Sequence, residues 1–525
     1  MSFLPDLLRF GPAEKMIKGW HEVPCGSRRG GLAGFICQQG FTAGLVLVMV
    51  CAAGKAFAQA DPKDPIARAI ATVEGARGKA EQDSKRPVFH LRPPAQWMND
   101  ICGAFFIDGW HHVFYQFNPW SDRWGKGVGW GHARSRDLVS WEILPPALLP
   151  DLSNGSELDG SGSAAIDGQG RPILFFTHTP IGYPKFKRQQ WAAVPEDEGL
   201  LRWKRVDIGL APGRSGVPED IPAGWADMFV FRAVGRTLAT FKASRGLVCE
   251  AVDPGLRQWK AVGQIKEIEG ECPNLFPLGG QFALIRSTLP ISYLLGDFDA
   301  EKVSFRPGEA GPRVLDYGPG SEIGRAARGL YGTNVFIDGQ GRAILLGWIS
   351  GFPEGKGWNG CMSLPRLLRI EEGHLVQAPL PELSILRGAR ATAGPVTLDS
   401  AARPMEGFRS GSFEVAAEFR PGTARACGLR LRSGGGKEIV LRAEGNRWNI
   451  AGTETPLSAS RGGGVRVQAF FDRSVMDVFL NDGRATVTRH VAHDADEFTL
   501  ELFAEEGTVE VVSCDAWMLK PIWER

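Results

Sequence analysis

One unit recurs along the chain and restricts its fold more than any other feature: a short apolar strand, a turn built on glycine, and a second apolar strand. The unit occurs at 105–117, 164–178, 231–241, 276–287 and 335–349. Pairs of strands joined by such turns are β-hairpins. Their spacing of about 45–70 residues lies in the range of β-propeller repeats. Because the same turn chemistry recurs, the pattern favours a five-bladed β-propeller over a generic sandwich.

The pattern changes after about Leu380, where apolar and polar residues begin to alternate. The alternating stretches are 412–419, 429–445, 465–488 and 501–517. Alternation with period two is typical of the half-buried strands of a β-sandwich. The sequence therefore predicts an all-β protein, with a five-bladed β-propeller at 85–380 followed by a C-terminal β-sandwich at 394–522.

Residues 1–60 have the pattern of a signal segment. Arg28 and Arg29 precede an apolar run at 41–54, and Ala56-Phe57-Ala58 follows as a cleavage signal of small residues. The run is shorter than the roughly 20 residues that cross a bilayer as a helix, so a cleaved signal is favoured over a stable membrane anchor. We expect an exported protein, either periplasmic or extracellular.

Charge and composition exclude several classes of partner. The 60 Lys and Arg residues nearly balance the 59 Asp and Glu residues, and without a basic stripe we expect no nucleic acid as a partner. We also expect no metal and no organic cofactor, because the histidines form no ligand cluster and Cys-x-x-Cys is absent from the sequence. The six cysteines beyond residue 60 are either disulfide-bonded or buried as free thiols.

Three acidic residues stand out because each precedes an apolar strand in a different repeat. They are Asp100 in QWMNDICGAFF, Asp227 in GWADMFVF and Glu271 in EGECPNLFPL. Taken alone, Asp100 fits a turn equally well and Asp227 fits a strand end better, whereas a charge like Glu271 is unusual beside an apolar run. The innermost strands of a propeller converge, so the three acids can meet there. Two carboxyl groups flanking one bond are what glycoside cleavage requires.

Several ordered motifs carry a resemblance to a known family. They are Trp97-Met98-Asn99-Asp100, GWGHARSRDLVSWE (129–142), Ser161-Gly162-Ser163, Glu271-Cys272-Pro273, GWNGCMSLPR (357–366) and FFDRSVMDVFLNDGRA (470–485). Together they resemble glycoside hydrolase family 32, the β-fructofuranosidases, which include invertases, inulinases and levanases. The resemblance spans about residues 86–520 and implies a five-bladed propeller with a β-sandwich.

The resemblance implies a role for each acid. Asp100 corresponds to the nucleophile, Glu271 to the acid/base and Asp227 to the stabiliser of the transition state, in a retaining reaction that releases fructose from sucrose, inulin or levan. The family's substrate pocket corresponds to Trp97, Asn99, Gln116, Trp124 and Ser161. The expected partner is thus a small-molecule carbohydrate. Two alternatives remain open: a non-catalytic carbohydrate-binding propeller, and a fructosyltransferase that uses the same acids.

The chain departs from the family pattern in three places. It has Asp-Ile-Cys-Gly at 100–103 where the family usually has Asp-Pro-Asn-Gly, and Gly160 where an aromatic residue is usual. It also has Ala226-Asp227-Met228 in place of Arg-Asp-Pro. That arginine should bind fructose hydroxyls, and losing such a charged hydrogen bond costs about 1.5–3 kcal/mol. Arg232 is the candidate replacement, provided that its side chain faces the pocket.

Overall fold

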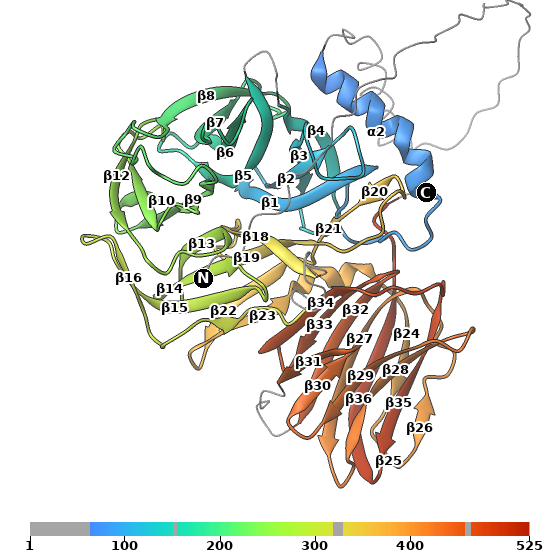
Figure 1. Ribbon diagram of the computed structural model, residues 1–525. Helices are drawn as coiled ribbons and strands as arrows, with labels where there is room; N and C mark the ends of the chain where they lie inside the picture. Colours follow the sequence, from blue (N-terminus) through green and yellow to red (C-terminus); the bar gives the residue numbers. More distant parts are fainter. Residues whose placement is uncertain (1–63, 151–154, 319–328, 457–463, 524–525) are drawn as a thin grey trace, which may run out of the picture. The chain divides into compact units, whose positions relative to one another are not determined.

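The computed structural model describes residues 64–150, 155–318, 329–456 and 464–523, so the predicted signal segment at 1–60 lies outside the described residues. The described strands form seven sheets (Figure 1). Among the described residues, helix is confined to α2 (Pro65–Glu81) and the short 3-10 helix η2 (Pro381–Leu386). The prediction of an all-β protein is confirmed. No helix in the described part of the chain is both long and apolar enough to cross a membrane.

Five of the sheets lie between Gln96 and Pro379, and each begins with one of the predicted hairpins. The first sheet contains β1 (Gln96–Ile107), β2 (Trp110–Asn118), β3 (Gly129–Ser135), β4 (Glu142–Leu148) and β20 (Trp358–Asn359). The second contains β5 (Ser156–Ile166), β6 (Pro172–Pro180), β7 (Gln189–Pro195) and β8 (Trp203–Leu210). The third contains β9 (Ala226–Ala233), β10 (Arg236–Lys242), β11 (Leu247–Ala251) and β12 (Trp259–Gln264).

The fourth and fifth sheets follow the same plan. The fourth contains β13 (Glu271–Leu278), β14 (Gln281–Ser287), β15 (Ser292–Asp299), β16 (Ser304–Pro307) and β17 (Arg313–Val314). The fifth contains β18 (Leu330–Ile337), β19 (Ala343–Ile349), β21 (Cys361–Met362), β22 (Arg366–Glu371) and β23 (His374–Pro379). All five predicted hairpins are confirmed as antiparallel pairs of neighbouring strands.

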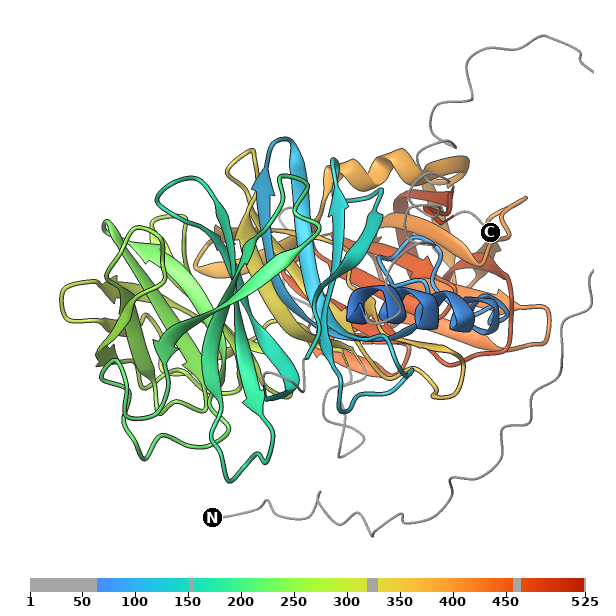
Figure 2. The same cartoon turned by 90° about the horizontal axis from the view of Figure 1, so that it is seen from above.

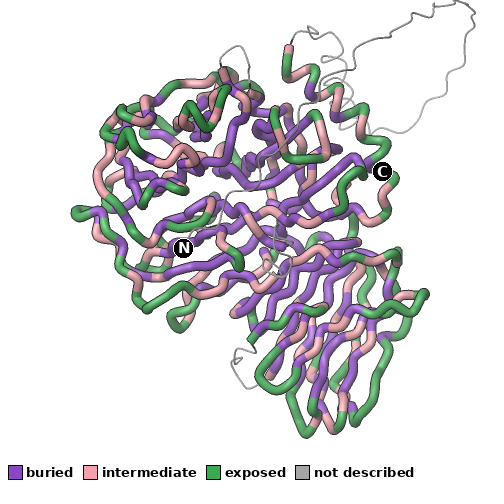
Figure 3. The backbone as a smooth tube through the Cα atoms, in the orientation of Figure 1, coloured by how far each residue is buried: buried purple, intermediate pink, exposed green. Residues whose placement is uncertain are grey.

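The first strands of these five sheets form a closed ring of contacts. Strand β1 contacts β5, β5 contacts β9, β9 contacts β13, β13 contacts β18, and β18 contacts β1 again (Figure 1). In addition, β20, which follows β19 of the fifth sheet in sequence, pairs in parallel with the start of β1 in the first sheet. Most residues of these five strands are buried, as the purple tube in Figure 3 shows, so side chains from any of them can reach a common centre.

An apolar cluster fills the space between each pair of neighbouring sheets in the ring. Between the first and second sheets, for example, Phe105 and Phe114 pack with Leu174 and Phe176. Burial of a large apolar side chain contributes about 1.5–3 kcal/mol to the free energy of unfolding. Because each sheet buries such side chains on both faces, its stability depends on both neighbouring sheets. This dependence holds the ring of inner strands in place.

The same turn chemistry closes two of the hairpins. The segment Asp-Gly-Gln-Gly-Arg occurs at 167–171 and again at 338–342. The Asp167 carboxylate accepts hydrogen bonds from the backbone N–H groups of Gln169 (2.8 Å) and Arg171 (2.9 Å), and Asp338 does the same three sheets later. An Asp that satisfies its own turn in this way fixes the reversal of the chain.

The two remaining sheets lie between Arg387 and Leu519 and face one another across a single apolar core. One contains β24 (Arg387–Ala393), β25 (Val396–Asp399), β27 (Ser412–Pro421), β32 (Val465–Asp472), β33 (Val475–Leu480), β34 (Ala485–His490) and β36 (Thr508–Leu519). The other contains β26 (Ala402–Pro404), β28 (Ala426–Ser433), β29 (Glu438–Glu444), β30 (Arg447–Ile450), β31 (Thr453–Pro456) and β35 (Phe498–Glu505). Two sheets that share one core are the plan expected from the alternating pattern.

Helix α2 was not predicted from the sequence. Asp64 caps its N-terminus by accepting a hydrogen bond from the Ile66 N–H group at 3.0 Å, and Pro65 follows the cap. Val73 and Ala80 are buried in the apolar cluster of the first and fifth sheets. The helix, dark blue in Figures 1 and 2, contacts β1 and β4. Residues just before the predicted start at 85 therefore contribute to this core.

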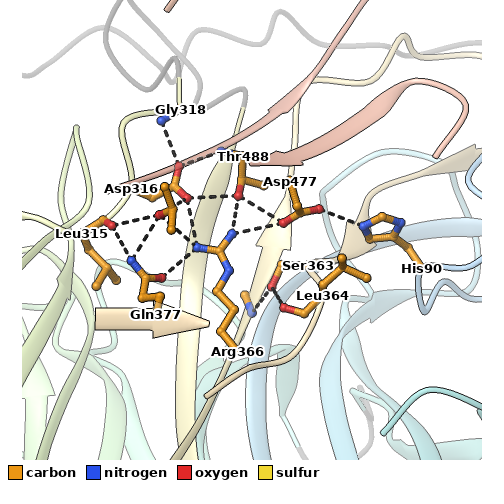
Figure 4. A network of polar contacts seen from close by, with 12 residues as sticks. His90, Leu315, Asp316, Gly318, Ser363, Leu364, Arg366, Gln377, Asp477 and Thr488 are labelled. Carbon is orange, nitrogen blue, oxygen red and sulfur yellow. Dashed lines mark hydrogen bonds and ion pairs between the residues drawn. The ribbon is translucent and has the colours of Figure 1, made fainter. Parts of the chain in front are cut away.

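A buried polar network joins the ring of five sheets to the two C-terminal sheets (Figure 4). Arg366 on β22 is fully buried, and its guanidinium donates to Asp316 at 3.0 Å and to Asp477 on β33 at 3.1 Å. His90 contacts Asp477 through Nε2 at 3.0 Å and Asp472 through Nδ1 at 2.8 Å. Although burial opposes it, hydrogen bonding to these two carboxylates raises the pKa of His90 to about 9. The network therefore pairs two buried cations with three carboxylates.

Candidate active site

A cavity of about 350 Å³ contains side chains from all five sheets of the ring. All eight site residues predicted from the sequence line it: Trp97, Asn99, Asp100, Gln116, Trp124, Ser161, Asp227 and Glu271. The structure thus brings together residues that lie up to 174 positions apart along the chain. Seven of the eight belong to strands of the first four sheets, and Trp124 belongs to the β2–β3 connection.

Each inner strand has an irregular register beside the cavity. Pairing is interrupted next to Asp100 on β1, between Gly160 and Gly162 on β5, and next to Asp227 on β9. It is interrupted again between Glu271 and Asn274 on β13 and between Tyr331 and Asn334 on β18. Bulges re-aim side chains and are frequent next to active sites.

The backbone is unusual at two of these bulges. Asp227 has φ +57° and Cys272 has φ +44°. Residues other than glycine seldom adopt this left-handed backbone conformation. The turn at Cys272 directs its N–H group to Asp227 Oδ2 at 3.1 Å. It also places Cys272 Sγ 3.8 Å from both Asp100 Oδ2 and Asp227 Oδ2, so the two carboxylates flank one sulfur atom. Local conformation therefore fixes the relative positions of the two aspartates.

Asp100 is almost fully buried and is held by one hydroxyl group. Ser161 Oγ donates to Asp100 Oδ2 at 2.7 Å. Burial, together with the charges of Glu271 and Asp227, raises the pKa of Asp100 to about 6. A carboxyl group with a raised pKa in a cavity, coupled to two further carboxylates, is the arrangement expected of a catalytic site.

The predicted pocket residues form a connected wall beside Asp100. Trp97 Nε1 donates to Asn99 Oδ1 at 2.7 Å, and Asn99 Nδ2 donates to Gln116 Oε1. The Trp97 ring lies 5.7 Å from the ring of Trp348, centroid to centroid. Trp124 has 57% of its surface exposed and lines the same cavity. Apolar ring faces combined with amide groups suit a ligand that has both C–H faces and hydroxyl groups, such as a sugar.

Further residues that the sequence analysis did not select also line the cavity: Leu158, Gly160, Thr177, Arg188, Ala226, Lys242, Tyr331 and Trp348. Lys242, at the end of β10, forms an ion pair with Glu271. Arg188 donates to the carbonyl oxygen of Gly224 at 3.3 Å, and its guanidinium lies 4.8 Å from the centre of the Tyr183 ring. The cavity therefore contains two cationic side chains besides its three carboxylates.

The proposed replacement of the missing arginine by Arg232 is wrong. The Arg232 side chain is exposed and donates to the carbonyl oxygen of Ile166 at 2.8 Å, away from the cavity lining. Asp227 stands at the start of β9 and Arg232 near its end, about 16 Å of extended strand away, so Arg232 lies beyond the reach of the cavity. The sequence left open whether the six cysteines beyond residue 60 form disulfides or are free. In the described part of the chain all six are buried free thiols.

Comparison with known proteins identifies the family. The sequence model of the glycosyl hydrolases family 32 N-terminal domain matches residues 90–379, and that of the family 32 C-terminal domain matches residues 382–518. The chain belongs to glycosyl hydrolase family 32. This confirms the resemblance seen in the sequence motifs, and the chain is a glycoside hydrolase.

Individual relatives are similar over most of the chain. A levanase of Bacillus subtilis is 29% identical and covers 83% of this chain and 71% of its own length. A sucrose-6-phosphate hydrolase of Zymomonas mobilis is 29% identical and covers 83% of this chain and 92% of its own length. Among solved structures, an exo-inulinase of Aspergillus awamori superposes with a TM-score of 0.72 at 21% identity, covering 84% of this chain and 99% of its own. A β-fructofuranosidase of Bombyx mori, solved with sucrose, has a TM-score of 0.72 at 21% identity and covers 89% and 100%.

Proposed function

We propose that this family 32 hydrolase releases fructose from sucrose or from fructans with retention of configuration. The observation that carries the proposal is that Asp100, Asp227 and Glu271, from three different sheets, line one cavity together with Trp97 and Trp124. Relatives named levanase and sucrose-6-phosphate hydrolase, and a solved relative that holds sucrose, support this class of substrate.

In this proposal Asp100 is the nucleophile and Glu271 is the acid/base. Asp100 attacks the anomeric carbon of a terminal fructosyl unit while Glu271 gives its proton to the leaving oxygen. Water then hydrolyses the fructosyl-enzyme, with Glu271 accepting a proton from it. Asp227, whose carboxylate is held by the Cys272 N–H group, stabilises the positive charge that develops on the sugar ring.

The pocket residues have complementary roles in the proposal. Ser161 orients the Asp100 carboxylate by its 2.7 Å hydrogen bond to Oδ2. Asn99 and Gln116 offer amide groups to the fructose hydroxyls, and the rings of Trp97 and Trp124 cover the apolar face of the sugar.

We also infer that the five sheets are the blades of a five-bladed propeller at 85–380 and that the two C-terminal sheets are a sandwich at 394–522. The apolar run near the N-terminus leads us to infer export.

The test is release of free fructose by the purified full-length protein from sucrose, inulin and levan. Asp100→Asn removes the nucleophile and should lower the rate by on the order of 10³-fold or more. The matched control is Asp108→Asn, an exposed aspartate in the turn between β1 and β2, which should retain the wild-type rate.

Each alternative predicts a different product. A non-catalytic binding protein releases no fructose from any of the three substrates, and that result would contradict the proposal. A fructosyltransferase forms longer oligosaccharides in place of equimolar free fructose. Early-time NMR of the released sugar reports the configuration: inversion at the anomeric carbon would rule out Asp100 as the nucleophile, because a covalent intermediate gives retention.

A further inference from the structure

Lys242 is placed at the cavity in a way that its sequence position does not suggest. It is the last residue of β10, its side chain is 25% exposed, and its Nζ donates to Glu271 Oε1. In the ladder between β10 and β9 its partner is Ala226, and the register shifts between Thr240 and Lys242. The small side chain of Ala226 leaves room for the lysine on the same side of the sheet, where the family pattern has an arginine.

The ammonium group faces an excess of negative charge. Asp227 on β9 and Glu271 on β13 are nearest, and Asp100 on β1 lies beyond them in the same cavity. Although burial opposes it, the charges of Asp227 and Glu271 raise the pKa of Lys242. Cys272, Tyr331 and Arg188 are the other titratable or charged groups around the site. Lys242 is therefore charged over the whole range in which a glycoside hydrolase works.

We propose that Lys242 is a positioning residue with two effects. It holds the Glu271 carboxylate at the cavity, and it sets the pH above which the carboxylate cluster, formed by Asp100, Asp227 and Glu271, has lost its last proton. The inference rests on the proposed function, because it assigns a role to Lys242 through the acid/base. Its basis is the ion pair itself: a cation bonded to one carboxylate favours the ionised form of that group.

The consequence can be followed through both steps of the reaction. In the first step a bond forms between an Asp100 oxygen and the anomeric carbon, the bond to the leaving oxygen breaks, and the Glu271 proton moves to that oxygen. Glu271 is then a carboxylate beside the Lys242 ammonium, which stabilises it. In the second step the water oxygen bonds to the anomeric carbon, Asp100 leaves, and the water proton returns to Glu271. Lys242 thus stabilises the Glu271 carboxylate that the first step produces and holds it in place for the second.

The cation also affects the cluster as a whole. The charges of Glu271 and Asp227 raise the pKa of Asp100, so the carboxylates of the cavity influence one another. Once the last proton has left, none is available for the leaving oxygen. Removing the positive charge of Lys242 raises the proton affinity of the whole cluster. The upper pH limit of activity should therefore move to higher pH.

The experiment compares pH profiles of kcat/KM on sucrose for wild type, Lys242→Met and Lys242→Arg, with Lys242→Gln as a second neutral variant. The neutral variants should move the alkaline limb upward by about one pH unit or more, with a lower kcat at the optimum. Lys242→Arg should keep the limb closer to wild type than to the neutral variants. The control is Lys126→Met, which removes an exposed lysine that pairs with Glu157 and should leave the profile unchanged.

A double-mutant cycle separates an effect through Glu271 from a loss of structure. On an aryl fructoside whose leaving group needs no proton, Lys242→Met should change the rate far less in a Glu271→Gln background than in wild type. Equal effects in both backgrounds, or a Lys242→Met profile that superposes on wild type, would overturn the role of Lys242. If wild type releases no fructose, the proposed function itself fails, and that result is separate from either outcome for Lys242.

Discussion

Gly332 on β18 offers a direct test of whether Asp100 must lie where the structure places it. Gly332 has φ +51°, and a Cβ atom added there would lie 2.7 Å from Asp100 Cγ and 2.9 Å from Asp100 Cα, and closer still to Oδ1. Carbon atoms in contact normally lie about 3.5–4.0 Å apart, so Gly332→Ala must displace Asp100 by roughly 1 Å. One of the atoms is backbone, so rotation of the Asp100 side chain cannot relieve the clash.

The expected loss follows from that displacement. A misplacement of about 1 Å in a catalytic group can cost about 10²-fold in rate. Gly332→Ala should therefore lower kcat/KM for fructose release by about 100-fold. The left-handed backbone also costs an alanine about 1–2 kcal/mol, which should appear as a lower Tm.

Gly341→Ala separates these two effects. Gly341, in the turn between β18 and β19, has φ +76°, and a Cβ added there meets no described atom within 4 Å. The control should lose about as much stability as Gly332→Ala and keep wild-type kcat/KM. The reasoning would be refuted if Gly332→Ala stayed within threefold of wild type, or if Gly341→Ala lost activity to the same extent.

Two predictions follow from the pKa values of buried groups. Because Asp100 must be ionised to act as the nucleophile and has a pKa of about 6, wild-type kcat/KM should fall as pH drops below about 6, and a rate that is unchanged between pH 7 and pH 5 would contradict this. His90 has a folded pKa of about 9, above its unfolded value of about 6.5, so its stabilising effect is fully present below about pH 6.5 and is lost as pH rises through 9. The shift corresponds to about 3 kcal/mol, which urea unfolding at pH 6 and pH 10 should show for wild type and not for His90→Gln.

The hairpins were predictable because their signals are local. An Asp-Gly turn such as Asp108-Gly109 specifies a reversal between two apolar runs without help from the rest of the chain. Helix α2 carried local signals as well, in Asp64 and Pro65. Its buried face, however, consists of Ala69, Val73 and Ala80, which is too short an apolar stripe to stand out in the sequence.

Lys242 could not be predicted, because its position depends on distant parts of the chain. A lysine that follows an apolar strand is expected in solvent. Here the register shift before it and the small side chain of Ala226 turn it toward Glu271, which belongs to the next sheet. Arg232 shows the opposite case: a residue chosen for its nearness to Asp227 in sequence faces the outside.

The bulges explain why strand alternation alone could not have located the site. In a regular strand, neighbouring side chains point to opposite faces, so only one of two adjacent residues can face a given cavity. Yet Asn99 and Asp100 both line it, and so do Ala226 and Asp227. Each pair lies where the register of its strand is interrupted. The apolar pattern therefore fixes the strands and their ring, whereas the positions at which that pattern fails are the ones that concentrate polar groups at the centre. These polar residues were identified through their sequence motifs, because strand periodicity would place one residue of each adjacent pair on the face opposite the cavity.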